Sequence, residues 1–232
     1  MVKKIQNEMR RMANPQKAKD LRRFFKTGKG EYAAGDKFLG VMVPQTRLMV
    51  KKYWQEISLE EARELLKSGF HEERLLALLI LVKKFEKADE SLRKNIFDLY
   101  LANTVFINNW DLVDLSAPRI AGAYLFDKDR SILIKLARSK NIWERRISIL
   151  ATFWFIAKGE SEFALKIAEI LVNDEHDLIH KACGWMLREI GKRCRQDIEE
   201  IFLGKYYKTM PRTMLRYAIE RFDDKKRKHY ME

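Results

Sequence analysis

The chain has 232 residues, 47% of them hydrophobic, which is enough for one large domain or two small ones with a sizeable core. Its formal net charge of +13 suits a polyanionic partner. No apolar run reaches about 18 residues, which excludes a transmembrane helix. Two cysteines exclude a disulfide framework, and the basic first residues lack the apolar core of a secretory signal, so we expect a cytoplasmic protein.

Helical periodicity runs through the chain, with short polar breaks and few alternating apolar runs. Ser58 followed by Glu61 fits a capping box, and Pro44 and Pro211 suit first helical positions. The one long glycine-rich connection covers residues 26–40. The expected helices span residues 3–12, 15–27, 44–55, 58–68, 71–86, 89–102, 109–115, 118–126, 128–138, 142–158, 160–173, 175–192, 195–205 and 211–222.

This succession of helices predicts an all-α protein in which antiparallel helix pairs of about 30–45 residues stack as HEAT-like repeats. A stacked solenoid is curved, so we expect one domain over residues 1–232 whose concave face forms a basic groove. Residues 225–232 are expected as a short basic tail, either disordered or in contact with phosphates. No strict sequence repeat is visible, and a compact helical bundle is the alternative fold.

The positive charge is concentrated at both ends of the chain. Residues 1–52 carry 14 Lys and Arg against 4 Asp and Glu, and residues 181–232 carry 14 against 8. Residues 53–180 are slightly acidic, with 18 against 21. A basic surface of this size predicts a nucleic-acid partner, and general solubility is the alternative interpretation.

The stretch INNWDLVDLSAPRI (107–120) holds two aspartates among apolar residues. If Asn108 is the N-cap, Asp111 falls at N3, where a carboxylate has a structural reason to exist. Asp114 lies beyond the capping turn, on the same helical face as Trp110 four residues earlier. This pair is either a solvated aspartate beside a half-buried tryptophan or part of a functional site.

A second candidate site is the helix expected within residues 178–193. Lys181, Arg188 and Lys192 cluster opposite an apolar face, and Trp185 lies beside them. Cations around a ring fit a nucleic-acid contact, in which the charges bind phosphates and the ring packs on sugar or base. A tryptophan at a helix boundary with snorkelling lysines fits the pattern equally well.

The stretch IWERRISILATFWFI (142–156) is apolar nearly all round, so Arg145 and Arg146 on its flanks need an acidic partner in the protein or on a ligand. His176 and His180 are four residues apart with Cys183 nearby, but no second cluster completes a metal site. No phosphate-binding loop or nucleophile motif is present. We therefore expect no metal and no cofactor.

Five segments occur together in a recognisable order: FFKTGKGEYAAGDKFLGVMVPQTR (24–47), NNWDLVD (108–114), WERR (143–146), KACGWMLREIGK (181–192) and TMPRTMLRYAIERF (209–222). Jointly they resemble the DNA alkylation repair glycosylases of the AlkD type over nearly the whole chain. The resemblance implies a C-shaped solenoid of HEAT-like repeats. It also implies base excision repair, in which 7-methylguanine and 3-methyladenine are excised from duplex DNA by hydrolysis of the N-glycosidic bond.

The resemblance also implies roles for individual residues. Asp114 matches the catalytic carboxylate that stabilises an oxocarbenium-like sugar and positions water, without base flipping. Trp110, Trp185 and Arg146 match the other cleft residues, with Arg145 as the adjacent alternative arginine. Asp111 is then best interpreted as a cap. The residues expected to contact DNA are Lys29, Arg145, Lys181, Arg188 and Lys192.

The glycine-rich segment departs from the family by being longer, so its aromatic contact is open between Tyr32 and Tyr53. We expect a monomer acting on double-stranded DNA that carries alkylated bases. A non-catalytic HEAT-like scaffold that binds DNA or RNA is the main alternative, and a protein-binding adaptor is a third. The alternatives differ at Asp114, because a phosphate-binding groove gains nothing from a carboxylate.

Overall fold

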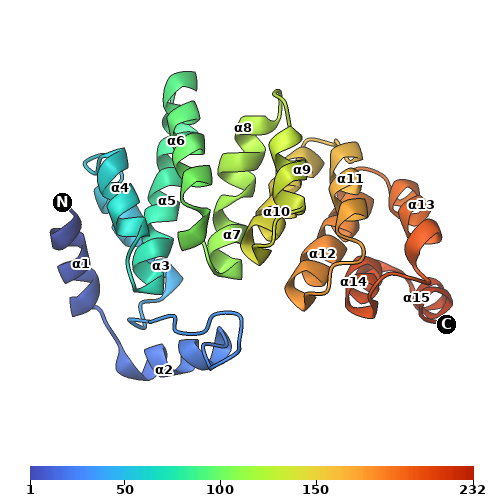
Figure 1. Cartoon of the computed structure of the whole chain (residues 1–232), viewed down its shortest axis with the longest axis horizontal. Helices are drawn as coiled ribbons and strands as arrows, with labels where there is room; N and C mark the ends of the chain where they lie inside the picture. Colours follow the sequence, from blue (N-terminus) through green and yellow to red (C-terminus); the bar gives the residue numbers. More distant parts are fainter. The chain divides into compact units, whose positions relative to one another are not determined.

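The computed structural model describes residues 1–232 and is all-α (Figure 1). Its one β-type pairing is an isolated bridge between Lys37 and Phe70. The predicted fold class is therefore confirmed. The chain divides into two compact units, an N-terminal unit of residues 1–116 and a C-terminal unit of residues 117–232.

The N-terminal unit is built around one long, central helix, α5. Its elements are α1 (Val2–Arg11), α2 (Pro15–Phe24), α3 (Val43–Tyr53), α4 (Leu59–Leu66), α5 (His71–Lys87), α6 (Glu90–Ala102), the 3-10 turn η1 (Thr104–Phe106) and α7 (Trp110–Ser116). Helix α5 packs against α3, α4, α6 and α7, and α1 packs against α4. The helices that contact α5 therefore lie beside it as a stack, whereas α2 lies apart, below them in the view of Figure 1.

The C-terminal unit repeats this arrangement around two long helices. Its elements are η2 (Pro118–Gly122), α8 (Ala123–Leu125), α9 (Ser131–Ala137), α10 (Ile142–Ala157), α11 (Glu162–Ile170), α12 (Asp177–Arg193), α13 (Gln196–Tyr206), α14 (Arg212–Ala218), η3 (Ile219–Arg221) and α15 (Asp224–Met231). One row runs from η2 through α10 and α12 to α14, and α9, α11 and α13 pack against it. Gly184 allows the close approach of α12 to α14, because a Cβ there would lie 2.4 Å from the Met214 carbonyl oxygen.

Helix α5 is buried over almost its whole length, including four polar residues in its first turn. Leu76, Leu78, Ile80 and Leu81 have no exposed surface, as expected for a helix surrounded by neighbours. The preceding residues HEER (71–74) are also buried. Buried charged side chains need hydrogen-bonding or oppositely charged partners. These four residues must therefore find such partners in the segments packed around the first turn of α5.

The glycine-rich connection between α2 and α3 is anchored to α5 by Glu72. Its carboxylate accepts backbone N–H bonds from Leu39, Gly40 and Val41, at 2.8–3.3 Å. Gly40 has a φ of +81°, and a Cβ there would lie 2.1 Å from the Asn14 carbonyl oxygen. These contacts hold the connection against α5 and against Asn14, the residue that precedes α2.

Most predicted helix boundaries agree with the structure to within a few residues. The capping box forms as predicted, since the Ser58 hydroxyl accepts from the Glu61 N–H and the Glu61 carboxylate accepts from the Ser58 N–H. Pro211 lies one position earlier than predicted, as the N-cap of α14. The basic tail is largely helical, because the Asp223 side chain caps α15 and Tyr230 is buried.

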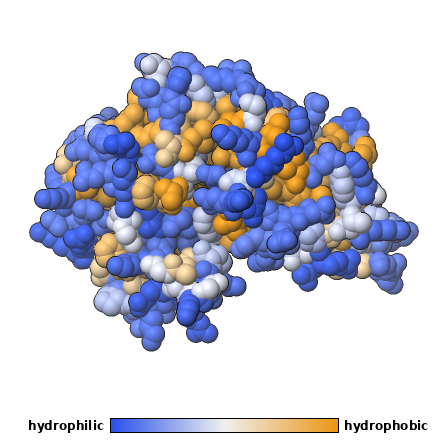
Figure 2. Space-filling view, viewed as in Figure 1, coloured by the Kyte–Doolittle hydropathy of each residue, from blue (hydrophilic) through white to orange (hydrophobic).

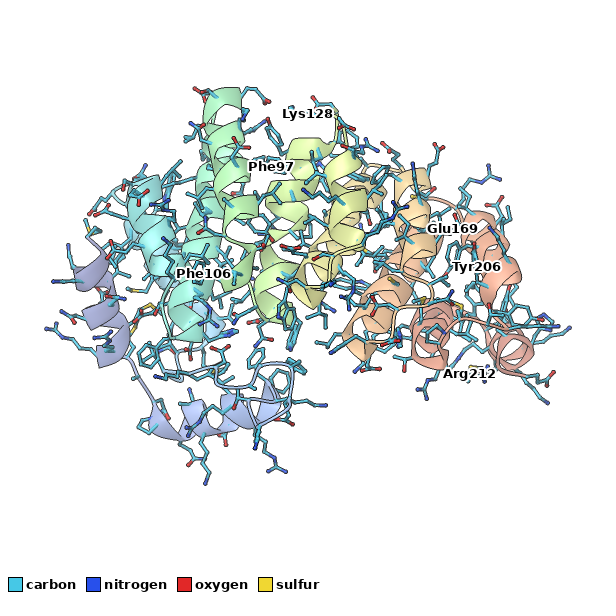
Figure 3. The ribbon with its side chains drawn as sticks, viewed as in Figure 1. Phe97, Phe106, Lys128, Glu169, Tyr206 and Arg212 are labelled. Atoms are coloured by element: carbon cyan, nitrogen blue, oxygen red, sulfur yellow. The ribbon has the colours of Figure 1, made fainter.

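The surface is mostly hydrophilic on the face in Figure 2, with hydrophobic patches between the polar side chains. Side chains also link α11 and α13, two of the helices that pack against the row of η2, α10, α12 and α14. Figure 3 shows Glu169 on α11 beside Tyr206 on α13, whose hydroxyl donates to that carboxylate. The same carboxylate accepts from Lys205 at 2.7 Å. The outer helices are thus joined at their exposed surfaces by polar contacts.

Candidate functional site

Helix α7 begins one residue later than the capping interpretation assumed. The Asn109 side chain accepts a 2.8 Å hydrogen bond from the Trp110 N–H, and its carbonyl accepts from the Val113 N–H at 3.2 Å. Asn109 is therefore the residue that precedes the helix, and Asp111 is at N2. The interpretation of Asp111 as an N3 capping residue is wrong.

Asp111 instead binds a histidine from another helix. Its Oδ2 lies 2.8 Å from Nε2 of His71, the first residue of α5. The other ring nitrogen of His71 lies 3.0 Å from Oδ2 of Asp36, in the glycine-rich connection. Arg74 completes the chain by donating to both Asp36 oxygens, at 2.8 and 2.9 Å. Four alternating charges thus join α5, α7 and the connection.

These four charged side chains are buried, and the charges around His71 and Asp36 shift the pKa values of those two residues. The exposed fractions of the side chains are 2% for His71, 4% for Asp36, 5% for Arg74 and 12% for Asp111. Burial lowers the pKa of His71, but the charge of Asp111 and the hydrogen bonds that the ring donates to both carboxylates outweigh it and raise the pKa to about 9. Burial likewise opposes the lowered pKa of Asp36, which the His71 hydrogen bond and the Arg74 charge produce.

Aromatic rings fill the space next to this chain and support Trp110. The Phe25 ring stacks on the Trp110 indole with a centroid distance of 5.2 Å, and Phe24 meets the indole edge-on at 5.9 Å. Phe38 stacks on the His71 ring at 4.6 Å and on Phe25 at 5.2 Å. The connection therefore contributes Phe25 and Phe38 to this cluster. The alternative aromatic Tyr53 is buried elsewhere, with its hydroxyl donating to Glu8.

A pocket of about 380 Å³ opens between α2, α3, α5 and α7. Trp110 and Asp114, both half-buried, lie on its wall, so the structure brings together the pair singled out in the sequence. Most of the remaining wall is apolar, which strengthens electrostatic interactions inside it. The other lining residues are Leu21, Phe24, Phe25, Phe38, Val41, Met42, Val43, Arg47, His71, Glu72, Leu75, Asp111 and Leu115.

The predicted arginines of the C-terminal unit lie at the start of α10. Arg145 donates to Asp174 at 2.6 Å and to the Ser139 carbonyl at 3.0 Å, which joins α10 to the segment before α12. Arg146 is buried and donates to the Leu178 carbonyl at 2.5 Å. Arg145 therefore has its acidic partner within the protein.

Trp185 lies on α12 at the edge of the core. Its indole ring lies 5.8 Å from the ring of Phe153. The predicted apolar face of this helix is confirmed, since Ile179, Met186 and other members of the face are fully buried. Trp185 is half-buried, which leaves part of its indole accessible.

The predicted DNA-contacting cations have different surroundings. Lys181 and Arg188 line a polar hollow of about 640 Å³ between α12 and α14, together with Arg216. Lys181 pairs with Asp177 at 2.7 Å, and Arg188 pairs with Glu220. The remaining two, Lys29 in the glycine-rich connection and Lys192 on α12, are exposed.

Sequence reasoning missed Asp36, His71 and Arg74. They come from segments about 35–40 positions apart, so no local spacing connects them. One usable signal was HEER directly before the apolar run LLALLILV (75–82), because charged residues at such a position need buried partners. The phenylalanines in FFK and DKF, flanking the glycines, were a second signal.

No group of three potential metal ligands forms in the structure. His176 caps α12 by accepting from the Leu178 N–H, and His180 bonds to the Asp174 carbonyl. No helix is both long enough and apolar enough to span a bilayer.

Comparisons with known proteins agree with this architecture. The chain matches the family model described as DNA alkylation repair enzyme over residues 5–222. A solved structure described as a predicted DNA alkylation repair enzyme from Enterococcus faecalis superposes with a TM-score of 0.70. The match covers 91% of this chain and 97% of that chain at 16% identity, so it shows a shared fold. No curated protein matches the chain significantly in sequence.

Proposed function

The chain belongs to the DNA alkylation repair enzyme family, and we propose that it is a DNA glycosylase for cationic alkylated purines. Its substrates on this proposal are 7-methylguanine and 3-methyladenine in duplex DNA, and its reaction is hydrolysis of the N-glycosidic bond. The net charge of +13 supports a nucleic-acid substrate. We propose that it acts as a monomer in base excision repair.

The observation that carries this proposal is the difference between the two aspartates of α7. Asp111 holds His71 and so has a structural role. Asp114 lies on the wall of the pocket with Trp110. A purely phosphate-binding surface would be weakened by a carboxylate at this place, whereas a site that stabilises a sugar cation requires one.

The chemistry follows from the charge of the lesion. A purine alkylated at N7 or N3 is cationic, so it departs with the bonding electron pair as a neutral base. Positive charge then develops on the deoxyribose, as in other glycosidic cleavages. The Asp114 carboxylate would stabilise this cation and orient a water molecule, whose oxygen bonds to C1′ and whose proton is released.

The other site residues would hold the DNA backbone rather than read the base. Trp110 and Trp185 offer indole faces for sugar contacts and for favourable interaction with developing positive charge. Arg146 is proposed as the cleft arginine, with Arg145 as the adjacent alternative. A base that leaves so readily needs no reading pocket, so we propose that the reaction proceeds without base flipping. The pocket beside Asp114 gives room for the sugar edge and the attacking water.

Phosphate contacts are also proposed for five cations, one in the N-terminal unit and four in the C-terminal unit. Electrostatic contacts of this kind supply affinity that falls with salt and is independent of sequence. The lysines that form the fewest ion pairs within the protein can contribute the most affinity, because no ion pair must be broken when they bind a phosphate. The five residues are Lys29, Arg145, Lys181, Arg188 and Lys192.

The proposal is tested by base release from a duplex containing 7-methylguanine, using wild type, Asp114→Asn and the control Asp98→Asn. Asp98 is an exposed residue of α6 that pairs with Lys94 at 2.5 Å. We expect release by wild type and the control, and a loss of about 100-fold or more in Asp114→Asn with DNA binding retained. Binding without release by all three proteins would instead favour a non-catalytic scaffold.

A further inference from the structure

His71 lies between two carboxylates in a way that requires both of its ring nitrogens to donate. Nδ1 is 3.0 Å from Asp36 and Nε2 is 2.8 Å from Asp111. A neutral imidazole carries one N–H and would present a lone pair to one of these carboxylates. The geometry therefore fits a buried imidazolium, and a neutral ring would leave one of the two carboxylates without its hydrogen bond from His71.

The same ring supports the candidate site by two routes. Through Asp111, it fixes the first turn of α7, which begins at Trp110 and whose next turn carries Asp114. Through ring contacts, it lies 4.9 Å from Phe25, which in turn stacks on the Trp110 indole at 5.2 Å. Both routes end on the pair that lies on the pocket wall.

We propose that His71 is a positioning residue for Trp110 and Asp114, acting through Asp111 and Phe25. This proposal rests on the proposed glycosylase function for its consequence in activity, but the positioning itself can be measured without catalysis. His71 would contact neither the DNA nor the reacting atoms. Its role is to hold the start of α7 against α5 and the glycine-rich connection, so that the carboxylate and the indole keep a fixed geometry.

The charges around His71 indicate how this role can be tested. Asp36 faces it from the connection, with Arg74 behind that carboxylate, and Asp111 faces it from α7. Glu72 is bound to backbone N–H groups, and Asp114 lies on the same pocket wall. The charge of Asp111 is the largest favourable contribution to the raised pKa of His71. Removing that charge should bring the titration of His71 down toward its ordinary value of about 6.5.

The test variant is Asp111→Asn in the full chain, which keeps a side-chain oxygen to accept from His71 but removes the charge. Two quantities are followed from pH 6 to 8.5: single-turnover release of 7-methylguanine and the NMR signal of the Trp110 indole N–H. In wild type, where the pKa of His71 is raised to about 9, we expect both quantities to stay constant up to about pH 8 and to change only slightly at pH 8.5. In Asp111→Asn we expect release to fall about 10- to 100-fold as the pH rises, because a displaced catalytic group is costly.

The indole signal and the His71 imidazole signal should titrate together in Asp111→Asn, while DNA binding stays constant. Asp36→Asn should behave in the same way, and His71→Gln should show low release with no such step. The positioning role would be overturned if the indole signal and the release rate stayed unchanged while the His71 imidazole signal titrates. If wild type releases no base while the two signals still titrate together, the positioning role stands and the proposed glycosylase function falls.

Discussion

The buried imidazolium predicts that the protein loses stability in a specific pH range. The pKa of His71 is about 9 in the folded chain and about 6.5 in the unfolded one. The folded state therefore binds this proton more tightly. Its contribution to stability is complete below about pH 6.5, declines as the pH rises, and is gone above about pH 9. Replacing His71 with Gln should remove this dependence.

The size of the effect follows from the shift. A difference of about 2.5 units at about 1.4 kcal/mol per unit gives about 3 kcal/mol between pH 6 and pH 9.5. His71 is almost fully buried, so solvent screening reduces this figure little. The neighbouring Asp36 stays ionised throughout this range, because its pKa is lowered.

The assay is urea unfolding of wild type and His71→Gln at a series of pH values. Other groups titrate in the same range, such as Glu199, whose pKa burial raises to about 8. Their effects cancel in the difference between the two proteins. The free energy of unfolding lost through His71→Gln should shrink by about 3 kcal/mol from pH 6 to 9.5. A difference that stays constant across this range would refute the buried imidazolium.

Two further predictions concern the glycine-rich connection and the proposed DNA contacts. Gly40→Ala should lower the free energy of unfolding by about 2–4 kcal/mol, because its Cβ would overlap the Asn14 carbonyl, whereas Gly35→Ala, also at positive φ but with open space around it, should cost about 1 kcal/mol. Equal losses in urea unfolding would contradict the steric argument. Lys192→Ala should reduce the slope of log K against log salt by about 0.9, and Lys181→Ala by less, because Lys181 also pairs with Asp177. Fluorescence anisotropy with a labelled duplex measures both slopes, and a larger change in Lys181→Ala would count against this ranking.

Local patterns in the sequence were sufficient to predict the helices. The capping box at Ser58 and Glu61 and the apolar face of α12 depend on residues within a turn or two of each other. The start of α7 was displaced by one residue, because Asn108 and Asn109 are equally good caps by type. That single step changed the interpretation of Asp111.

The environment of the site could not be predicted, because it depends on contacts between distant segments. Asp111 and His71 are 40 positions apart, and Asp36 and Arg74 are 38 apart. Neither partner has a periodicity that reveals the other. The pairing of Trp110 with Asp114 could be predicted from the sequence, since residues four apart on a helix share a face. The residues that hold this pair in place could not be predicted.

The central claim is that the Asp114 carboxylate performs the chemistry. The most direct measurement is the single-turnover rate of 7-methylguanine release from duplex DNA by wild type and Asp114→Asn, at enzyme concentrations that saturate the duplex. Our account predicts that the rate falls by about 100-fold or more in the variant while its affinity for the duplex is maintained. Equal rates in the two proteins would contradict it.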